Sequence, residues 1–211
     1  MSDSDAATQD AAPIAAVVQM TSGPDVEENL AAAAEHLAAA AAAGAEMAVL
    51  PENFACVPQR EIDRLQTAEP DGDGPIQSFL AAQAAAHGLM IVGGTIPLRA
   101  TPGRVSASCL VYDRNGRRRA RYDKIHLFDV AVPGSRESYR ESDAIAHGDT
   151  TVVVDSPAGQ LGLAVCYDLR FPELFRRLLA DGMEVAALPS AFTATTGEAH
   201  WDLLVRARAV E

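Results

Sequence analysis

The strongest constraint on the fold of this chain is a strand–helix–strand pattern near its N-terminus. Residues 14–19 (IAAVVQ) and 46–50 (EMAVL) are short apolar runs of the kind that form buried strands. Between them, Asp25 is suited to cap a helix that runs to about residue 43, and Gly44 is suited to end it. Because two strands joined by a crossover helix lie parallel in one sheet, this pattern predicts a sheet covered by helices.

The rest of the chain extends this α/β pattern without an internal repeat or a linker. Asn115-Gly116 and Ala158-Gly159 are turn sequences that predict two hairpins. Residues 58–74 predict a polar loop with one helical turn, and residues 128–148 predict a long irregular segment of the kind that is usually functional or disordered. Further strands are expected at residues 89–96, 105–112, 118–122, 151–155, 161–166 and 184–188, and further helices at residues 75–87, 171–180 and 199–210. We therefore predict one α/β domain over residues 13–211, preceded by a disordered acidic tail over residues 1–12.

Charge and composition argue against two classes of partner. The formal net charge is −12, whereas nucleic acids and anionic membranes are bound by positive surfaces. No apolar run approaches the roughly 20 residues of a membrane span, and the N-terminus lacks the basic start and apolar core of a secretory signal. The cysteines at positions 56, 109 and 166 are odd in number and have no metal-binding spacing. We therefore expect a cytoplasmic protein that binds neither nucleic acid nor membrane and has no metal site.

One compositional fact singles out a residue. Of the 17 basic residues, only Lys124 is a lysine, and the rest are arginines. Arginine and lysine serve equally well on a solvated surface, so a lysine that remains in an arginine-biased chain is a candidate for a task that needs a compact ammonium. The alternative explanation is that this one lysine remains by chance and has no special task.

Three reactive side chains are predicted at or near strand ends, where α/β proteins bind their ligands. Glu52, Lys124 and Cys166 each follow or end one of the predicted strands. Together they suffice for acyl transfer: a thiolate attacks, a carboxylate takes its proton, and an ammonium lowers the pKa of the thiol and stabilises the oxyanion. A thiol just before a helix start also gains from the partial positive charge there.

Each of these residues alone has a simpler interpretation. Cys166 would be a core residue, Glu52 an exposed loop acid or helix cap, and Lys124 a surface charge. A cysteine–histidine protease is the weaker catalytic alternative, because neither His126 nor His200 lies in a recognisable protease signature.

Three motifs in one order resemble the nitrilase superfamily of carbon–nitrogen hydrolases: VLPENF at 49–54, RYDKIHLFD at 121–129 and LAVCYDLRFPEL at 163–174. The resemblance runs from Ile14 to the C-terminus. It implies that residues 13–211 form a carbon–nitrogen hydrolase domain with a four-layer α-β-β-α sandwich. It also implies a homodimer or larger homo-oligomer that acts on a small-molecule amide without a metal or organic cofactor.

The resemblance further implies a role for each matching residue. Cys166 is implied as the nucleophile, Glu52 as the general base and Lys124 as the cation that stabilises the oxyanion. Members of the family often carry a second glutamate between the lysine and the cysteine. The YRES motif places it at Glu141, with Glu137 as the alternative.

Substrate-binding residues follow from the same motifs. The backbone N–H of Tyr167 is implied as part of the oxyanion hole, and Arg170 is a candidate clamp for a substrate carboxylate. The alternative for Arg170 is a structural ion pair with Asp168 or Glu173. Three further residues are candidates for the pocket lining: Phe192, Thr195 and Thr196.

The branch of the superfamily is indicated by Tyr167-Asp168, by LPSAF at 188–192 and by TGEAHWDLLVRARAVE at 196–211, which are most similar to the Nit group of amidases. The implied enzyme is an amidohydrolase that cleaves a linear C–N amide bond of a small carboxylate-bearing substrate of the deaminated glutathione type. It works through a cysteine thioester and releases ammonia or an amine. An ω-amidase acting on α-ketoglutaramate and another amidase of the superfamily, such as one for N-carbamoyl amino acids, stay open as alternatives.

The sequence stops at Glu211, where members of the family normally continue with further strands. We therefore expect a sandwich without its C-terminal strands, with sheet edge and apolar surface exposed. A truncated, non-catalytic protein that binds partners through that surface is the alternative from a different functional class.

Overall fold

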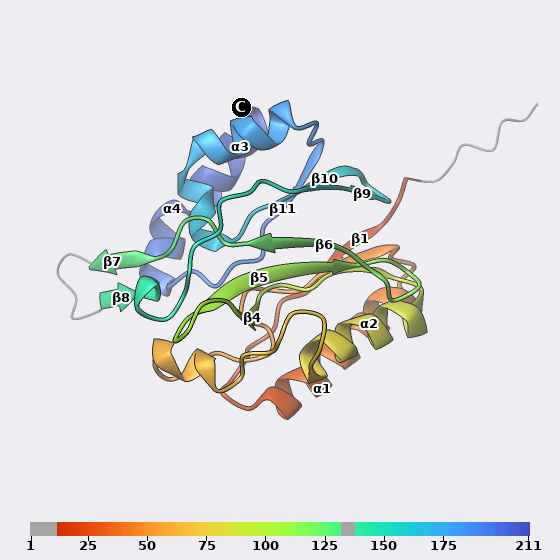
Figure 1. Cartoon of the computed structure of the whole chain (residues 1–211). Coiled ribbons are helices and arrows are strands. Elements are labelled where there is room, and N and C mark those ends of the chain that lie inside the picture. Colours follow the sequence, from red (N-terminus) through yellow and green to blue (C-terminus); the bar gives the residue numbers. More distant parts are fainter. Residues whose placement is uncertain (1–11, 132–137) are drawn as a thin grey trace, which may run out of the picture.

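The chain folds as helices packed on both sides of paired sheets (Figure 1). This computed structural model describes residues 12–131 and 138–211, so the predicted acidic tail lies outside the described residues except for residue 12. The helices of the described part are α1 (Val26–Ala42), α2 (Pro75–His87), α3 (Pro172–Ala180) and α4 (Ala194–Val210). As predicted, Asp25 caps α1 by accepting a hydrogen bond from the N–H of Glu28, and Gly44 follows its end in the left-handed region.

The larger sheet has the order β1-β2-β3-β5-β4, with β6 on the opposite edge of β5. Its strands are β1 (Ala15–Val17), β2 (Met47–Val49), β3 (Met90–Val92), β4 (Ile96–Arg99), β5 (Val105–Tyr112) and β6 (Arg118–Asp123). The first three are parallel, and α1 joins β1 to β2, which confirms the predicted strand–helix–strand unit. Strand β5 is antiparallel to all of its neighbours.

The prediction of one continuous strand at residues 89–96 is wrong, because this stretch bends between two strands that share an edge of β5. Strand β3 ends at Val92 and β4 begins at Ile96. Gly94 lies in the bend with a φ of 54°, and a Cβ at this position would overlap the carbonyl oxygen of Pro51. The bend therefore requires glycine, and it packs directly against the residue that precedes Glu52.

The smaller sheet has the order β11-β10-β9 and comes from the C-terminal part of the chain. Its strands are β9 (Val153–Ser156), β10 (Gly159–Leu163) and β11 (Val185–Ala187). The first two form the predicted hairpin, and α3 crosses over to the parallel strand β11. The segment predicted to be irregular contains a separate pair, β7 (Asp129–Ala131) and β8 (Ser138–Arg140). Three 3₁₀ turns complete the described chain: η1 (Glu61–Leu65), η2 (Glu141–Asp143) and η3 (Cys166–Arg170).

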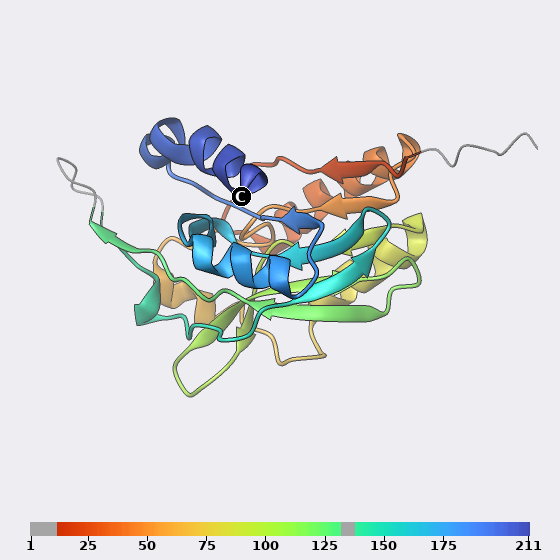
Figure 2. The ribbon, with the colours of Figure 1, turned by 90° about the horizontal axis from the view of Figure 1, so that it is seen from above.

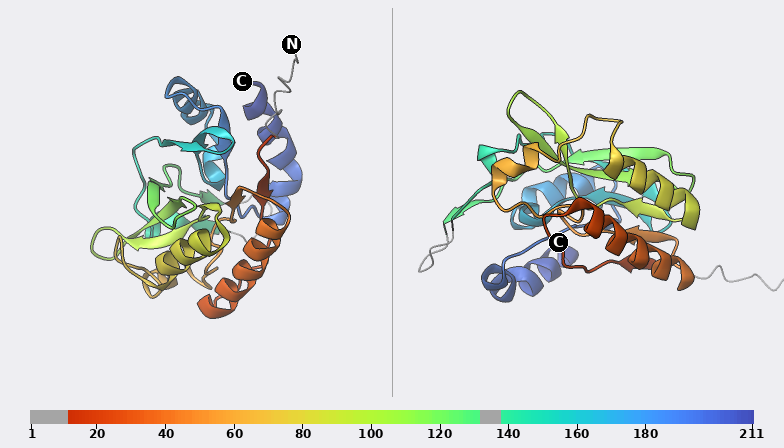
Figure 3. Two further views of the ribbon diagram at one scale, coloured as in Figure 1. Left: turned by 90° about the vertical axis from the view of Figure 1, so that its right-hand side faces the viewer. Right: turned by 90° about the horizontal axis from the view of Figure 1, so that it is seen from below.

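The helices and sheets form four layers, whose arrangement can be followed in Figures 1 and 3, and apolar side chains fill the three interfaces between them. The interface between α1, α2 and the larger sheet contains Leu37, Leu50 and Leu80. The two sheets meet face to face through Met47, Val92, Tyr122, Leu161 and Val165. The outer face of the smaller sheet is covered by α3 through Leu174, Phe175 and Leu178. The expected α-β-β-α order is therefore confirmed.

Two outermost elements differ from their predictions. Residues 14–19 were expected to form a buried strand, but β1 lies at a sheet edge and the residue Val17 is 85% exposed. An apolar run alone does not show whether a strand lies in the middle of a sheet or at its edge. Helix α4 begins at Ala194 instead of residue 199, and none of its residues is buried. Figure 2 shows α4 on the same side of the molecule as β1, and Val17 and Trp201 line a common groove.

The start of α2 is held by a carboxylate from a preceding loop. The N-cap residue Gly74 has no side chain, so the buried Glu69 takes its place. Its oxygens accept hydrogen bonds from the N–H of Ile76 at 2.5 Å, from the N–H of Gln77 at 3.1 Å and from the side-chain amide of Gln77 at 3.0 Å. The positive end of the helix dipole stabilises this buried charge.

Candidate active site

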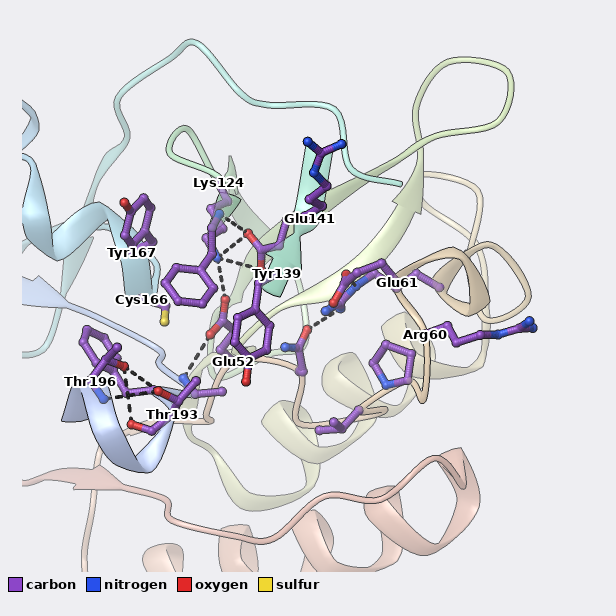
Figure 4. A pocket seen from close by; sticks show the side chains of 18 of the residues that line it. Glu52, Arg60, Glu61, Lys124, Tyr139, Glu141, Cys166, Tyr167, Thr193 and Thr196 are labelled. Carbon is purple, nitrogen blue, oxygen red and sulfur yellow. Dashed lines mark hydrogen bonds and ion pairs between the residues drawn. The ribbon is translucent and has the colours of Figure 1, made fainter. Parts of the chain in front are cut away.

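Four predicted catalytic residues come together at one end of the paired sheets. Glu52 follows β2, Lys124 follows β6, Glu141 begins η2 and Cys166 begins η3. All four line a single cavity of about 430 Å³. In Figure 4 the Cys166 side chain points into this cavity beside Glu52 and Lys124. The predicted alternative for the second glutamate, Glu137, lies outside the described residues.

Lys124 is the centre of a buried charge cluster. Its Nζ donates to Glu52 Oε1 at 2.8 Å and to both oxygens of Glu141, at 3.0 and 2.9 Å. The Lys124 side chain is 1% exposed. Burial works to lower the pKa of Lys124, but the charges of Glu52 and Glu141 outweigh it and hold this pKa above its ordinary value. The lysine is therefore a fixed ammonium.

The two carboxylates are fixed from behind by backbone donors. Glu52 Oε2 accepts the N–H of Ala191 at 2.9 Å, and Glu141 Oε2 accepts the N–H of Phe128 at 2.8 Å. Burial raises the pKa of Glu141, and the nearby charge of Glu52 adds to this effect while Lys124 opposes it. The cluster holds two carboxylates and one ammonium, which leaves it able to take up one proton.

Cys166 occupies a constrained backbone position. The structure places it at the start of η3 rather than at the end of a strand, because β10 ends at Leu163. Its φ is 45°, a left-handed conformation that is uncommon outside glycine, asparagine and aspartate. Its N–H donates to the carbonyl of Pro189 at 2.9 Å. Such strained residues persist where the surrounding structure fixes them, often at functional sites.

The pKa of the Cys166 thiol is raised, whereas the sequence predicted that it would be lowered. Burial and the charge of Glu52 raise the pKa of Cys166 well above its ordinary value, although Lys124 acts in the opposite direction. The burial of the thiol arises from packing between the two sheets, which residue types at strand ends do not reveal. At neutral pH the thiol is therefore protonated and needs a base to become a nucleophile.

Arg170 lines the cavity and lies among aromatic rings. Its guanidinium carbon is 5.8 Å from the ring centre of Tyr167 and 5.9 Å from that of Phe192. Its Nη2 lies 3.2 Å from Nδ1 of His200. Among the described residues it has no ion pair with Asp168 or Glu173, so the structural alternative for Arg170 is not realised.

Of the three candidates for the pocket lining, Phe192 and Thr196 line the cavity and Thr195 does not, and Tyr167 lines it as well. Because α4 begins at Ala194, Thr193 becomes its N-cap, and its side chain accepts the N–H of Thr196 at 3.2 Å. Thr193 and Thr196 therefore face the cavity, whereas Thr195 is exposed.

Sequence reasoning missed the wall that η1 forms. The buried Arg64 donates to Asn53 Oδ1 at 2.7 Å and to Glu61 Oε2 at 2.7 Å, and all three residues line the cavity. Asn53 has a φ of 57° directly after Glu52. Arg64 lies in a polar loop without periodicity, so no pattern pointed to it, but the position of Asn53 beside the proposed base could have been a signal.

The cavity differs in charge from the rest of the chain. Among the described residues, the side chains that line it include five cationic ones, Arg60, Arg64, Lys124, Arg140 and Arg170, and three acidic ones, Glu52, Glu61 and Glu141. The full chain carries a net charge of −12. The cavity is therefore a positive region in an acidic protein and favours anionic ligands.

Within residues 12–131 and 138–211, no group of three or more His, Cys, Asp or Glu side chains is arranged to hold a metal ion. Within the same ranges, none of the helices combines the length and the apolar character that crossing a membrane would require.

Comparison with known proteins agrees with the motifs. The carbon–nitrogen hydrolase family profile matches residues 14–211. A deaminated glutathione amidase from Yersinia enterocolitica is 41% identical over 198 residues, which cover 93% of this chain and 68% of that protein.

Solved structures show the same relationship. The Caenorhabditis elegans NitFhit protein superposes with a TM-score of 0.81 at 36% identity, over 92% of this chain and 48% of that one. An amidase from Nesterenkonia sp. superposes with a TM-score of 0.77 at 25% identity, over 93% of this chain and 73% of that one, and its structure records acrylamide added to the active-site cysteine. The chain thus belongs to the carbon–nitrogen hydrolase family, within the Nit branch of the nitrilase superfamily.

Proposed function

We propose that this chain hydrolyses a linear amide of a small carboxylate-bearing molecule of the deaminated glutathione type, through a thioester on Cys166. The observation that carries the proposal is the Lys124 ammonium, which bridges Glu52 and Glu141 beside the thiol in one cavity. The substrate class is supported by the name of the Yersinia relative. The chemistry needs no metal or organic cofactor, because base, acid and oxyanion cation are all side chains.

In the first half-reaction, Glu52 takes the proton of the Cys166 thiol, and the sulfur attacks the amide carbonyl. The ammonium of Lys124 has three N–H donors, and two suffice to hold Glu52 and Glu141. When substrate binds, the N–H of one of the two contacts to Glu141 turns to the oxyanion of the tetrahedral intermediate, which also accepts the backbone N–H of Tyr167. As the intermediate collapses, the carboxylic acid of Glu52 gives its proton to the leaving nitrogen, and the acyl group stays on sulfur.

In the second half-reaction, Glu52 takes a proton from water, and the resulting hydroxide attacks the thioester carbonyl. Collapse expels the sulfur, which recovers its proton from Glu52, and the carboxylic acid product leaves. Glu141 keeps Lys124 in place through both steps by the hydrogen bond to the ammonium that remains when one N–H turns to the oxyanion. The raised pKa of Cys166 fits this scheme, because the proton moves to Glu52 only as the sulfur attacks.

Arg170 is the proposed anchor for the substrate carboxylate. Its guanidinium is oriented by the Tyr167 and Phe192 rings, and among the described residues its one polar partner is the ring of His200. A planar guanidinium suits a carboxylate, to which it can donate two parallel hydrogen bonds. Thr193 and Thr196 also line this cavity with their hydroxyl-bearing side chains.

We also propose that the chain works as a homodimer or a larger homo-oligomer. Support comes from α4, where Leu203 is 66% exposed and none of the helix residues is buried. Sedimentation or light scattering of the purified chain tests this, and a monomer at micromolar concentration contradicts it.

The function is tested by incubating the chain with deaminated glutathione and following the release of 2-oxoglutarate and cysteinylglycine by mass spectrometry. An acid quench during turnover should show Cys166 carrying the 2-oxoglutaryl group. The variant Cys166→Ala should release neither product while keeping the wild-type melting temperature. Turnover by that variant contradicts the mechanism, and release of ammonia from α-ketoglutaramate alone assigns the ω-amidase activity instead.

A further inference from the structure

One carboxylate joins the two segments that carry the lysine and the cysteine. Asp168 is fully buried, and its two oxygens have four hydrogen-bonding contacts. Oδ2 accepts the hydroxyl of Tyr122 at 2.7 Å and the N–H of Val165 at 2.8 Å. Oδ1 accepts the N–H of His126 at 3.0 Å and lies 2.7 Å from Nδ1 of the same residue.

These partners flank the proposed catalytic residues on both sides. Tyr122 and His126 stand two residues before and two residues after Lys124, and Val165 directly precedes Cys166. We propose that Asp168 is a positioning residue that fixes the turn at Cys166 against the chain around Lys124. It thereby sets the position of the thiol relative to the ammonium. This inference rests on the proposed function, because it assumes the roles given there to Cys166 and Lys124.

The local backbone explains why such a clamp is needed. Lys124 lies just beyond the end of β6, and Cys166 lies beyond the end of β10 with a φ of 45°. The backbone N–H of Lys124 donates to the carbonyl of Ala107 and that of Cys166 to the carbonyl of Pro189, so each residue is tied to a different neighbour and these bonds do not join the two segments to each other. Charged hydrogen bonds in a buried site are stronger than neutral ones, so a single carboxylate that accepts from both segments couples their positions.

The orientations of the partners are themselves fixed. The ring of His126 stacks on Phe171 at a centroid distance of 3.6 Å and an interplanar angle of 7°. A carboxylate only accepts, so Nδ1 of His126 carries the proton in this network. Burial, together with the charge of Asp168, raises the pKa of Tyr122, which keeps its phenol protonated as a donor. Every partner of Asp168 is thus a donor.

The replacement Asp168→Asn tests the inference with almost no change in volume. An amide puts a donor where an acceptor stood, so at least one of the four donors loses its partner. The readout is the rate at which iodoacetamide alkylates Cys166, measured on the Cys166 peptide by mass spectrometry from neutral to alkaline pH. This readout needs no amide substrate, so it separates the inference from the proposed function.

We expect alkylation at neutral pH to slow by about 10- to 100-fold, the range that misplacement of a reacting group brings. The difference in alkylation rate between the wild type and Asp168→Asn should become smaller at alkaline pH, where the thiol ionises without help from Glu52 and Lys124. Amide turnover should fall in kcat with little change in KM. A wild-type alkylation profile in Asp168→Asn overturns the inference, whatever happens to the melting temperature.

A matched control separates positioning from general loss of stability. Glu69 is also a buried carboxylate that accepts backbone N–H groups, but it caps α2 and does not line the cavity. Glu69→Gln should lower the melting temperature and leave alkylation of Cys166 unchanged. Equal slowing in Glu69→Gln and Asp168→Asn overturns the inference.

If Asp168→Asn does not fold, Tyr122→Phe carries the test. It keeps the aromatic ring in the core and removes one donor to Asp168. Alkylation should slow several-fold, and an unchanged rate overturns the inference. The proposed function can fail separately. If alkylation of Cys166 slows as expected in these variants but the wild-type chain hydrolyses neither proposed substrate, the positioning role of Asp168 stands and the substrate assignment is rejected.

Discussion

Replacing Lys124 by methionine removes one charge from a cluster that is closed to solvent. Methionine keeps the length and most of the volume of lysine, so the change is electrostatic rather than steric. The Glu52 and Glu141 side chains, which are 5% and 11% exposed, then face each other without the cation that holds both. Loss of one partner from a buried ion pair costs about 3–5 kcal/mol, because the remaining charge stays desolvated.

The penalty has a definite pH dependence. Two carboxylates that share a buried site cannot both ionise easily, so the pKa of one rises above its unfolded value. The folded variant then binds more protons than the unfolded chain, and its free energy of unfolding falls as pH rises from the unfolded pKa to the folded pKa. The slope reaches at most about 1.4 kcal/mol per pH unit. Burial already raises the pKa of Glu141 in the wild type, so its slope has the same sign but should be shallower.

Urea unfolding followed by circular dichroism measures both effects. Lys124→Met should unfold at a lower urea concentration than the wild type at neutral pH, and the gap should close in mildly acidic buffer. Arg206→Met is the matched control, because it removes a cation from the exposed pair with Asp202 at 3.8 Å and should leave the urea midpoint unchanged. A Lys124→Met midpoint and pH slope equal to those of the wild type would refute the buried cluster.

Three further changes test other parts of the structure. Arg170→Leu should raise KM for a carboxylate-bearing amide by about 10- to 100-fold, the equivalent of losing a charged hydrogen bond, and should leave a neutral amide unaffected in steady-state kinetics; equal losses for both amides would argue against a carboxylate anchor. Glu69→Ala should lower the free energy of unfolding in urea by about 1–3 kcal/mol, because the backbone donors of α2 lose their acceptor. Gly94→Ala should lower both the melting temperature and kcat, since the added methyl overlaps the Pro51 carbonyl next to Glu52. If the variant is destabilised but keeps the wild-type kcat, the bend at Gly94 does not control the position of Glu52.

The sequence was most informative where a local signal and a strand end coincide. Residues 75–87 were predicted as a helix and form α2 with the same bounds, because Pro75 suits the first turn and Gly88 ends the helix in a left-handed conformation. Glu52, Lys124 and Cys166 could be placed near one another, because the ends of strands in a layered α/β fold converge. Their catalytic roles remain proposals.

Features that depend on packing between distant segments could not be predicted. The contact of Arg64 with Asn53 joins a polar loop to a strand end, and neither residue type nor spacing signals it. Burial raises the pKa of Cys166, and that burial arises only when the two sheets pack together. Thr195 was a candidate for the pocket lining, but α4 begins at Ala194, five residues before its expected start, and this boundary decides which threonines face inward.

The burial of Lys124 makes it a reporter of motion. The chain has no other lysine, and this one is 1% exposed. Reagents that acylate side-chain amines therefore find no lysine on the folded surface, and they modify Lys124 only when the segments around it open. The labelling rate at Lys124 then measures the free energy of that local opening, in the same way as exchange of a protected amide hydrogen. A single covalent mark thus records how often the buried ammonium of Lys124 becomes accessible to a reagent.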